Sequence, residues 1–230
     1  MPVIAAPKNW DDHVVHAEEI ARGLGFQHLR DRIIELAESS PGQQAVDIGA
    51  GTGLLTLALA QRGVHVWAID IAPAMCDYIR AKASSAQLTG VDVAVASAVS
   101  LPLVDACADL VVSNYCFHHL NSADKQRALA EAHRILRPGG RLVFGDMMFA
   151  LSLSETRDRK VIADKVRAIA RKGPAGILRL AKNGARLATG RWEQPAPARW
   201  WAHALSDAGF TDITVEVLQH EGGLATARRP

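Results

Sequence analysis

Short apolar runs alternate with amphipathic stretches through the first two thirds of this chain. The apolar runs are rich in β-branched residues and predict strands at residues 44–48, 65–69, 91–96, 110–114 and 141–145. Between these runs apolar positions recur at helical spacing, which predicts helices at residues 54–61, 73–85 and 123–136. Strands and helices that alternate in this way are typical of a doubly wound parallel α/β sheet with helices on both faces.

Both ends of the chain depart from this alternation. Two further helices, at residues 11–22 and 26–39, predict a helical cap within residues 1–43. After the fifth strand we expect a basic, mostly helical lid insertion at residues 151–191. The last elements are a helix and two closely spaced strands, predicted at residues 198–208, 212–217 and 224–228. The two strands are too close for a helical crossover, so they predict a hairpin with one antiparallel member. The 230 residues are interpreted as a single domain.

The first predicted strand leads into a turn with alternating glycines, in the sequence Asp-Ile-Gly-Ala-Gly-Thr-Gly from Asp47 to Gly53. Glycine permits positive φ and lets backbone amides approach a polar ligand closely. Asp70 ends the next strand, where a βαβ unit offers a carboxylate to ribose hydroxyls. The spacing differs from the G-x-G-x-x-G pattern of dinucleotide sites. Because the acid of Asp47 would repel a pyrophosphate, the turn predicts a site for a nucleoside that carries positive charge.

These residues resemble the class I S-adenosylmethionine-dependent methyltransferases, and the resemblance runs from about residue 45 to the C-terminus. Segments similar to the family's motifs occur in the family's order at residues 47–53, 70–75, 101–102, 109–114 and 136–140. The resemblance implies S-adenosylmethionine as cofactor and a seven-stranded, mostly parallel sheet of order 3-2-1-4-5-7-6.

The resemblance also implies a role for each motif residue. Asp47 and the glycines should surround the methionine end of the cofactor, Asp70 should accept from both ribose hydroxyls, and Ile71 should lie against adenine. Ser97 stands where the family usually has an Asp facing the adenine amino group, and its hydroxyl is a weaker acceptor. The expected cofactor-binding set is Asp47, Gly49, Gly51, Gly53, Asp70, Ile71, Met75, Ser97, Ala98 and Asn114.

The candidate catalytic residues follow the fourth strand. Tyr115 and His118 are placed to face a methyl acceptor, and His118 is the first candidate for a general base, with His119 as the second. Alternatively, both histidines orient the loop and have a structural role. Asp146 ends the fifth strand at the same edge, where it could contact an acceptor or cap the first helix of the insertion.

Charge is distributed unevenly along the chain. The net charge is +2, but residues 151–191 contain eleven Lys and Arg against three Asp and Glu. Within this segment, residues 177–188 predict a helix with an apolar stripe opposite Arg179, Lys182 and Arg186. Such a helix suits a lid over a lipophilic or anionic acceptor, or a contact with an anionic membrane surface. The charges could equally face water without a partner.

Several classes are disfavoured by what the sequence lacks. The Pro-Pro turn that grips a flipped base does not follow Asn114, and the basic segment lacks stacking aromatics, so nucleic acid is not the expected partner. No apolar run approaches the ~20 residues that cross a bilayer, and the N-terminus does not read as a signal peptide, so we expect a cytoplasmic protein. The three cysteines have no metal-ligand spacing, and no metal site is expected.

The sequence therefore predicts a methyltransferase that modifies an oxygen or nitrogen of a small lipophilic or anionic metabolite. A peripheral membrane-associated lipid methyltransferase and a non-catalytic protein that binds S-adenosylmethionine remain as alternatives.

Overall fold

The computed structural model describes residues 14–150, 156–171, 173, 174, 177, 178, 182, 194–218 and 221–230. Its centre is a seven-stranded sheet of order β3-β2-β1-β4-β5-β7-β6, which confirms the expected order. The strands are β1 (Gln44–Ile48), β2 (His65–Asp70), β3 (Val91–Val95), β4 (Ala108–Asn114), β5 (Leu136–Met147), β6 (Thr211–Val217) and β7 (Gly222–Arg228).

The first five strands are parallel, and β7 is antiparallel to both of its neighbours. The expected hairpin of β6 and β7 is therefore confirmed. Register brings Asn114 beside Gly145, so the last residues of β4 and β5 end at the same edge of the sheet. The carboxyl ends of the parallel strands form the edge at which ligands bind in open α/β sheets.

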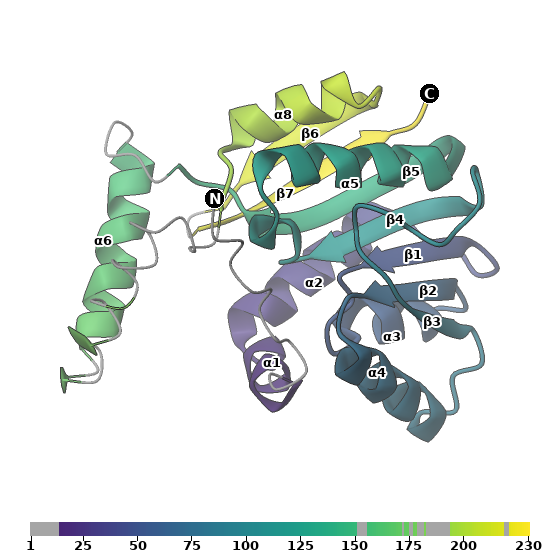
Figure 1. The fold of residues 1–230 in the computed structure, drawn as a ribbon, viewed down its shortest axis with the longest axis horizontal. Coiled ribbons are helices and arrows are strands. Elements are labelled where there is room, and N and C mark those ends of the chain that lie inside the picture. Colours follow the sequence, from purple (N-terminus) through teal and green to yellow (C-terminus); the bar gives the residue numbers. More distant parts are fainter. Residues whose placement is uncertain are drawn as a thin grey trace, which may run out of the picture.

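Helices cover both faces of the sheet (Figure 1). The helices are α1 (Val14–Ala21), α2 (Leu24–Ala37), α3 (Leu54–Ala60), α4 (Pro73–Ser85), α5 (Ser122–Ile135), α6 (Thr156–Ala170) and α8 (Ala198–Asp207), with a short 3-10 helix η2 (Phe117–His119). On one face α5 and α8 bury Leu129 and Trp201 against the sheet. On the other face α2 and α3 bury Ile33 and Leu59. Each face thus has its own apolar core, which holds the strand ends in place from both sides.

The helix boundaries differ slightly from those predicted. Helix α2 begins at Leu24 because Gly23 is extended at the N-cap, and it ends before Glu38, which adopts a left-handed φ of 45°. Strand β5 extends beyond residues 141–145 in both directions. The short helix η2 was not predicted at all, although it carries two of the candidate site residues.

The basic insertion is described only in part. Helix α6 stands apart from the sheet (Figure 1). Most of the predicted helix at residues 177–188 lies outside the described residues. Among the described residues, no helix is both long enough and apolar enough to cross a membrane.

Candidate functional site

The glycine turn joins β1 to α3 at the carboxyl edge of the sheet. Gly49, Gly51 and Gly53 all have positive φ, at 69°, 53° and 83°. A Cβ on Gly49 would lie 2.2 Å from the sulfur of Cys116, so only glycine fits there. A Cβ on Gly51 would meet no atom within 4 Å. The turn is therefore closely packed beneath Gly49 and open at Gly51.

Asp47 lies beneath this turn and is 1 % exposed. Its Oδ2 accepts hydrogen bonds from the backbone N–H of Thr56, at 3.0 Å, and from the Thr56 hydroxyl, at 2.6 Å. Burial raises the pKa of Asp47 to about 7; the bonds from Thr56 act in the opposite direction, and the charge of Asp70 adds to the rise. The carboxyl group thus caps the first turn of α3. It also places beneath the glycine turn a group whose protonation changes near neutral pH.

Asp70 fastens the glycine turn to the end of β2. Its two carboxylate oxygens accept from the backbone N–H of Gly51, at 2.8 Å, and of Ala72, at 2.9 Å. Ile71, between them in sequence, is 58 % exposed, which is unusual for a large apolar side chain beside a buried strand. An exposed apolar surface thus lies next to a carboxylate, and the adenine role of Ile71 and the ribose role of Asp70 stay predictions.

The remaining predicted cofactor residues differ in exposure. Ser97 and Ala98 are half-buried in the turn after β3, where the Ser97 hydroxyl accepts weakly from the N–H of Val99 at 3.4 Å. Met75, on the first turn of α4, is only 3 % exposed. Asn114 ends β4, and its Oδ1 is buried without a hydrogen-bond partner. A buried acceptor left unpaired is costly, so Asn114 marks a place where a ligand donor would fit.

His118 is held by Asp146 across the site. The carboxylate of Asp146 lies 2.6 Å from Nδ1 of His118 and also accepts from its backbone N–H at 3.0 Å. His118 is 4 % exposed and Asp146 is fully buried. Because a carboxylate only accepts, Nδ1 carries the hydrogen of this contact, and in the neutral form of the ring the lone pair is on Nε2. The arrangement of an oriented imidazole with a basic nitrogen is the one that general bases require.

Tyr115 forms an aromatic wall beside His118. It has a φ of 54° and stacks on Phe26 of α2, with ring centroids 4.5 Å apart, and meets His118 edge-on at 5.9 Å. Burial raises the pKa of Tyr115 above its usual value, and the charges of Glu221 and Asp146 act in the same direction. The phenol therefore stays protonated and does not act as a base.

His119 differs from its neighbour in exposure. Its side chain is exposed, with its ring centroid 3.9 Å from that of His118. The structure thus brings Tyr115, His118 and Asp146 together, and places His119 at the rim.

Sequence reasoning missed three contributors to this site. Phe26 reaches Tyr115 from the N-terminal cap. Lys82 of α4 donates to Glu18 of α1, at 3.2 Å, and to the backbone oxygen of Thr52, at 3.1 Å, which ties the cap to the glycine turn. Burial acts to raise the pKa of Glu18, but hydrogen bonds from Thr52 and Lys82 outweigh it and hold the pKa below its usual value. These contacts join segments that only the fold brings together.

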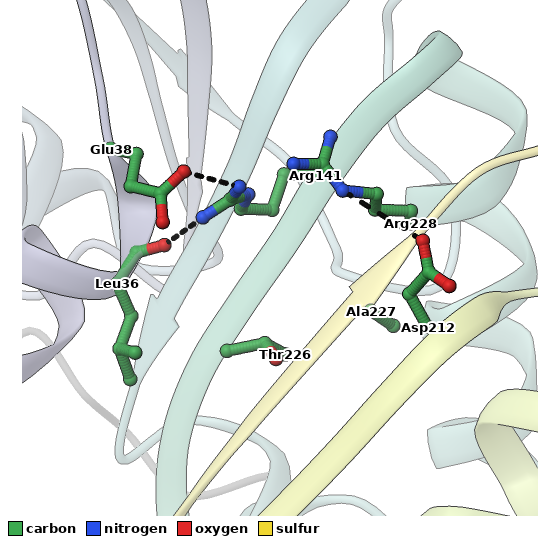
Figure 2. Close-up of a pocket in the computed structure, with 7 residues that line it drawn as sticks. All are labelled: Leu36, Glu38, Arg141, Asp212, Thr226, Ala227 and Arg228. Atoms are coloured by element: carbon green, nitrogen blue, oxygen red, sulfur yellow. Dashed lines mark hydrogen bonds and ion pairs between the residues drawn. The ribbon is translucent and has the colours of Figure 1, made fainter.

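A separate pocket of about 190 Å³ lies at the opposite edge of the sheet, against α2 (Figure 2). Arg141 donates to the backbone oxygen of Leu36, at 2.6 Å, and to Glu38, at 2.5 Å. Arg228 pairs with Asp212 at 3.9 Å. Both guanidinium groups face a carboxylate of their own, so this pocket is electrostatically balanced and offers no group for chemistry.

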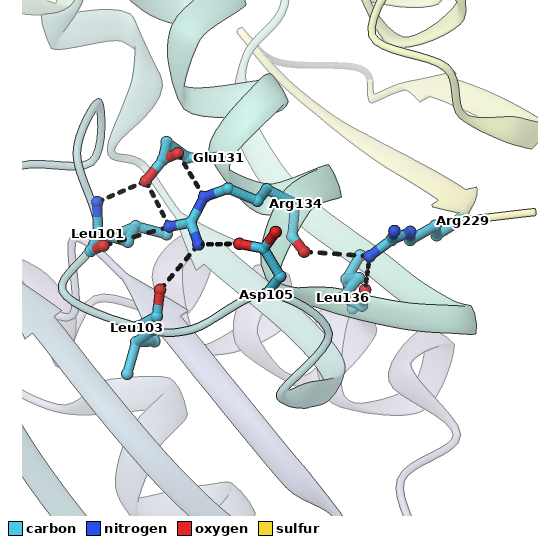
Figure 3. A network of polar contacts seen from close by, with 7 residues as sticks. All are labelled: Leu101, Leu103, Asp105, Glu131, Arg134, Leu136 and Arg229. Atoms are coloured by element: carbon cyan, nitrogen blue, oxygen red, sulfur yellow. Dashed lines mark hydrogen bonds and ion pairs between the residues drawn. The ribbon is translucent and has the colours of Figure 1, made fainter.

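An arginine network holds the loop between β3 and β4 (Figure 3). Arg134 of α5 donates to Glu131, Asp105 and the backbone oxygen of Leu103, each at 2.8 Å for the closest atoms. Glu131 in turn accepts from the N–H of Leu101 at 2.7 Å. The network therefore fixes the segment that follows Ser97 and Ala98 to the helix behind the sheet.

Comparisons with known proteins find methyltransferases. Residues 46–144 match the family model described as a methyltransferase domain. The chain is 33 % identical to an uncharacterized methyltransferase of Oceanobacillus iheyensis, over 59 % of this chain and 58 % of the relative. It is 40 % identical to a ubiquinone/menaquinone biosynthesis C-methyltransferase of Acidiphilium cryptum, over 51 % of this chain and 48 % of the relative. The chain thus spans about half the length of the curated relatives it matches.

Solved structures share the fold. The phosphoethanolamine N-methyltransferase 2 of Haemonchus contortus, solved in complex with S-adenosylmethionine, superposes with a TM-score of 0.71 at 15 % identity, covering 96 % of this chain and 57 % of that one. At this identity the likeness concerns the fold alone.

Proposed function

Because residues 46–144 match the family model of a methyltransferase domain, we propose that this chain is a class I S-adenosylmethionine-dependent methyltransferase. It transfers a methyl group to an oxygen or nitrogen of a small molecule, with His118 as the general base. The observation that carries this proposal is the buried 2.6 Å contact between His118 and Asp146 at the carboxyl edge of the sheet. Asp146 orients the imidazole and would stabilise the imidazolium that forms when Nε2 takes a proton.

The residues at the glycine turn fit the cofactor. Asp70 and the exposed Ile71 would hold the ribose and the adenine, and the open face of Gly51 leaves room for close approach to the backbone. The unpaired Oδ1 of Asn114 would accept from the ammonium group of the methionine end. When bound, S-adenosylmethionine supplies a methyl group on a positively charged sulfur, which leaves the protein to align an acceptor and to remove its proton.

The acceptor is proposed to be a small metabolite with a lipophilic part. Phe26 and Tyr115 form an aromatic wall next to His118, and Tyr115 stays protonated, so it can position an acceptor without competing as a base. The anionic character predicted for the acceptor rests on the basic insertion, about half of which lies outside the described residues. The named relatives do not narrow the choice, since one is a C-methyltransferase and the solved neighbour is an N-methyltransferase.

Two measurements test the proposal. Calorimetry with S-adenosylhomocysteine should detect binding to the wild-type protein. Incubation with tritiated-methyl S-adenosylmethionine and a small-molecule extract should then give labelled product. His118→Ala should bind the cofactor as before but turn over about 10²- to 10⁴-fold more slowly, which is the typical contribution of a general base. Binding without any transfer would support the alternative of a non-catalytic binding protein, and undiminished turnover of His118→Ala would remove the histidine from the mechanism.

Contact with an anionic membrane surface is a second candidate. Val166, Ile177 and Leu178 are 46 %, 64 % and 57 % exposed, in a segment where Lys160 and Arg167 are also exposed. Apolar side chains beside cations are typical of helices that lie on anionic lipid. Vesicle sedimentation should then show binding to vesicles with phosphatidylserine and none to neutral vesicles; equal sedimentation with both would exclude the electrostatic contact.

A further inference from the structure

Lys125 is buried on the inner side of α5 and is only 2 % exposed. Its Nζ donates to two backbone oxygens, those of Leu120 and of Gln194, the second at 2.7 Å. Among the described residues no carboxylate lies within ion-pair distance of this ammonium group. Lysine is almost never fully buried unless it is paired, so a buried ammonium held by carbonyl groups calls for an explanation.

The two carbonyls that Lys125 joins belong to segments on either side of His118. Leu120 directly follows η2, the short helix that carries His118. Gln194 is the first described residue after the basic insertion, at the point where the chain returns to the fold. Lys125 therefore connects the turn of the candidate base with the end of the insertion.

The peptide of Gln194 is held from both sides. Its N–H donates to the backbone oxygen of His118 at 2.7 Å, and its C=O accepts from Lys125. The other end of the insertion leaves from β5, whose Asp146 holds both the ring and the backbone N–H of His118. Both ends of the insertion are thus linked to the same histidine.

Resting on the proposed function, we propose that Lys125 is a positioning residue for His118, which keeps the imidazole in place by fastening the returning end of the insertion at Gln194 to the turn that ends at Leu120. Lys125 acts through these two carbonyls and does not touch the reacting groups.

The energetics agree with a positioning role. Burial lowers the pKa of Lys125 to about 8, while the charge of Asp146 acts in the opposite direction. A methionine would fill the same volume without this penalty. It would, however, remove the ammonium donor from the carbonyls of Leu120 and Gln194 and so break two partly buried hydrogen bonds that join their segments. The ammonium group therefore joins these two segments, although its burial lowers the stability of the folded state.

The test is a double-mutant cycle between Lys125 and His118. Lys125→Met in the wild-type background should lower kcat 10- to 100-fold for methyl transfer from tritiated-methyl S-adenosylmethionine into the small-molecule extract. The KM for the cofactor and the Kd for S-adenosylhomocysteine should change less than twofold. In a His118→Ala background the same change should have less than a twofold effect, because Lys125 acts through His118. A merely structural lysine would lower turnover in both backgrounds, and that result would overturn the proposal.

Two further variants complete the experiment. Gln194→Pro removes the N–H that donates to the backbone oxygen of His118, along with the glutamine side chain and the freedom of φ, so it should reproduce the loss of kcat with Lys125 in place. It carries the test if Lys125→Met does not fold. Arg127→Met, on the exposed side of the same helix, is the matched control and should keep full turnover. If His118→Ala alone leaves turnover unchanged, the proposed base fails. If His118→Ala slows turnover but Lys125→Met and Gln194→Pro do not, the positioning role fails by itself.

Discussion

Replacing Asp47 by asparagine should raise the free energy of unfolding at pH 8. This gain should become smaller as the pH falls. Asp47 is completely buried, and its pKa lies at about 7 in the folded protein against 3.8 for the ordinary side chain. The folded state therefore binds more protons than the unfolded state between these two values, and this group makes stability fall as the pH rises through them. Above pH 7 the full penalty of the buried charge is present, which corresponds to about 4 kcal/mol.

Asparagine has nearly the same shape and cannot ionise. Its oxygen can still accept from the N–H and hydroxyl of Thr56, whereas its amide N–H₂ replaces the other carboxylate oxygen and needs a partner of its own, at a cost of about 1–3 kcal/mol if it finds none. We expect a net gain of about 1–3 kcal/mol at pH 8. The cost of the asparagine amide does not depend on pH. The free energy of unfolding of the variant, relative to that of the wild type, should therefore grow by about 2.5 kcal/mol from pH 5 to pH 8.

Urea unfolding at both pH values, followed by the fluorescence of the tryptophans, which include the buried Trp201, measures this difference. Asp77→Asn is the control, because Asp77 is an exposed residue that pairs with Arg80 at the surface and should change stability by less than about 0.5 kcal/mol at either pH. A difference between Asp47→Asn and wild type that stays constant from pH 5 to pH 8 would refute the reasoning, since it would mean that Asp47 does not change its protonation on folding in this range.

Three further outcomes follow from the site. Asp70→Ala should abolish binding of S-adenosylhomocysteine in calorimetry, because it removes the proposed ribose acceptor and the anchor of the N–H of Gly51. Asp146→Asn should lower kcat by at least 10-fold with little change in cofactor binding, since an amide can impose the wrong tautomer on His118; equal turnover in steady-state assays would contradict this. Gly49→Ala should lose cofactor binding and several degrees of Tm in a thermal scan, because its Cβ would clash with Cys116 at a φ of 69°. Gly139→Ala is the control: it has a φ of 80° but open space around it, so it measures the strain of positive φ without a clash.

Local patterns in the sequence were sufficient for most of the fold. The alternation of apolar runs and amphipathic stretches predicts the first five strands, two closely spaced runs near the C-terminus predict the last two, and the spacing of the glycines predicts the turn after β1. The order of the strands came from the resemblance to a family, because pairing across a sheet is not written in local periodicity. The helix boundaries were less accurate where backbone conformation decides them, as at Gly23 and Glu38.

The contacts of the candidate site were harder to foresee because they join distant positions. His118 and Asp146 were each placed at the ligand edge, but only the fold shows that one orients the other. The stacking of Phe26 on Tyr115 brings the N-terminal cap to the end of β4 and had no sequence signal. The roles of the cofactor residues remain predictions, including that of Met75, whose burial leaves it little surface for a ligand.

Lys125 could have been recognised from the sequence. It precedes Ala128, Leu129 and Ala132 by three, four and seven residues, so helical periodicity places it on the buried face of α5. A lysine on an apolar face is usually interpreted as a residue at the edge whose charge reaches water. Here the side chain turns inward instead, where its ammonium group donates to the backbone oxygens of Leu120 and Gln194.

Charged side chains lower the stability of the folded state at one edge of the sheet and raise it at the other. At the carboxyl edge Asp47 and Lys125 are held where burial works against their charged forms, so each makes the folded state less stable at neutral pH. Towards the amino edge, Arg134 and Arg141 pair with carboxylates and also donate to backbone oxygens. Substitution of Arg141 should therefore lower stability while the remaining folded protein keeps its cofactor affinity. Substitutions at the carboxyl edge should alter binding or turnover even where they make the protein more stable, as functional sites that carry local strain or buried charge are expected to do.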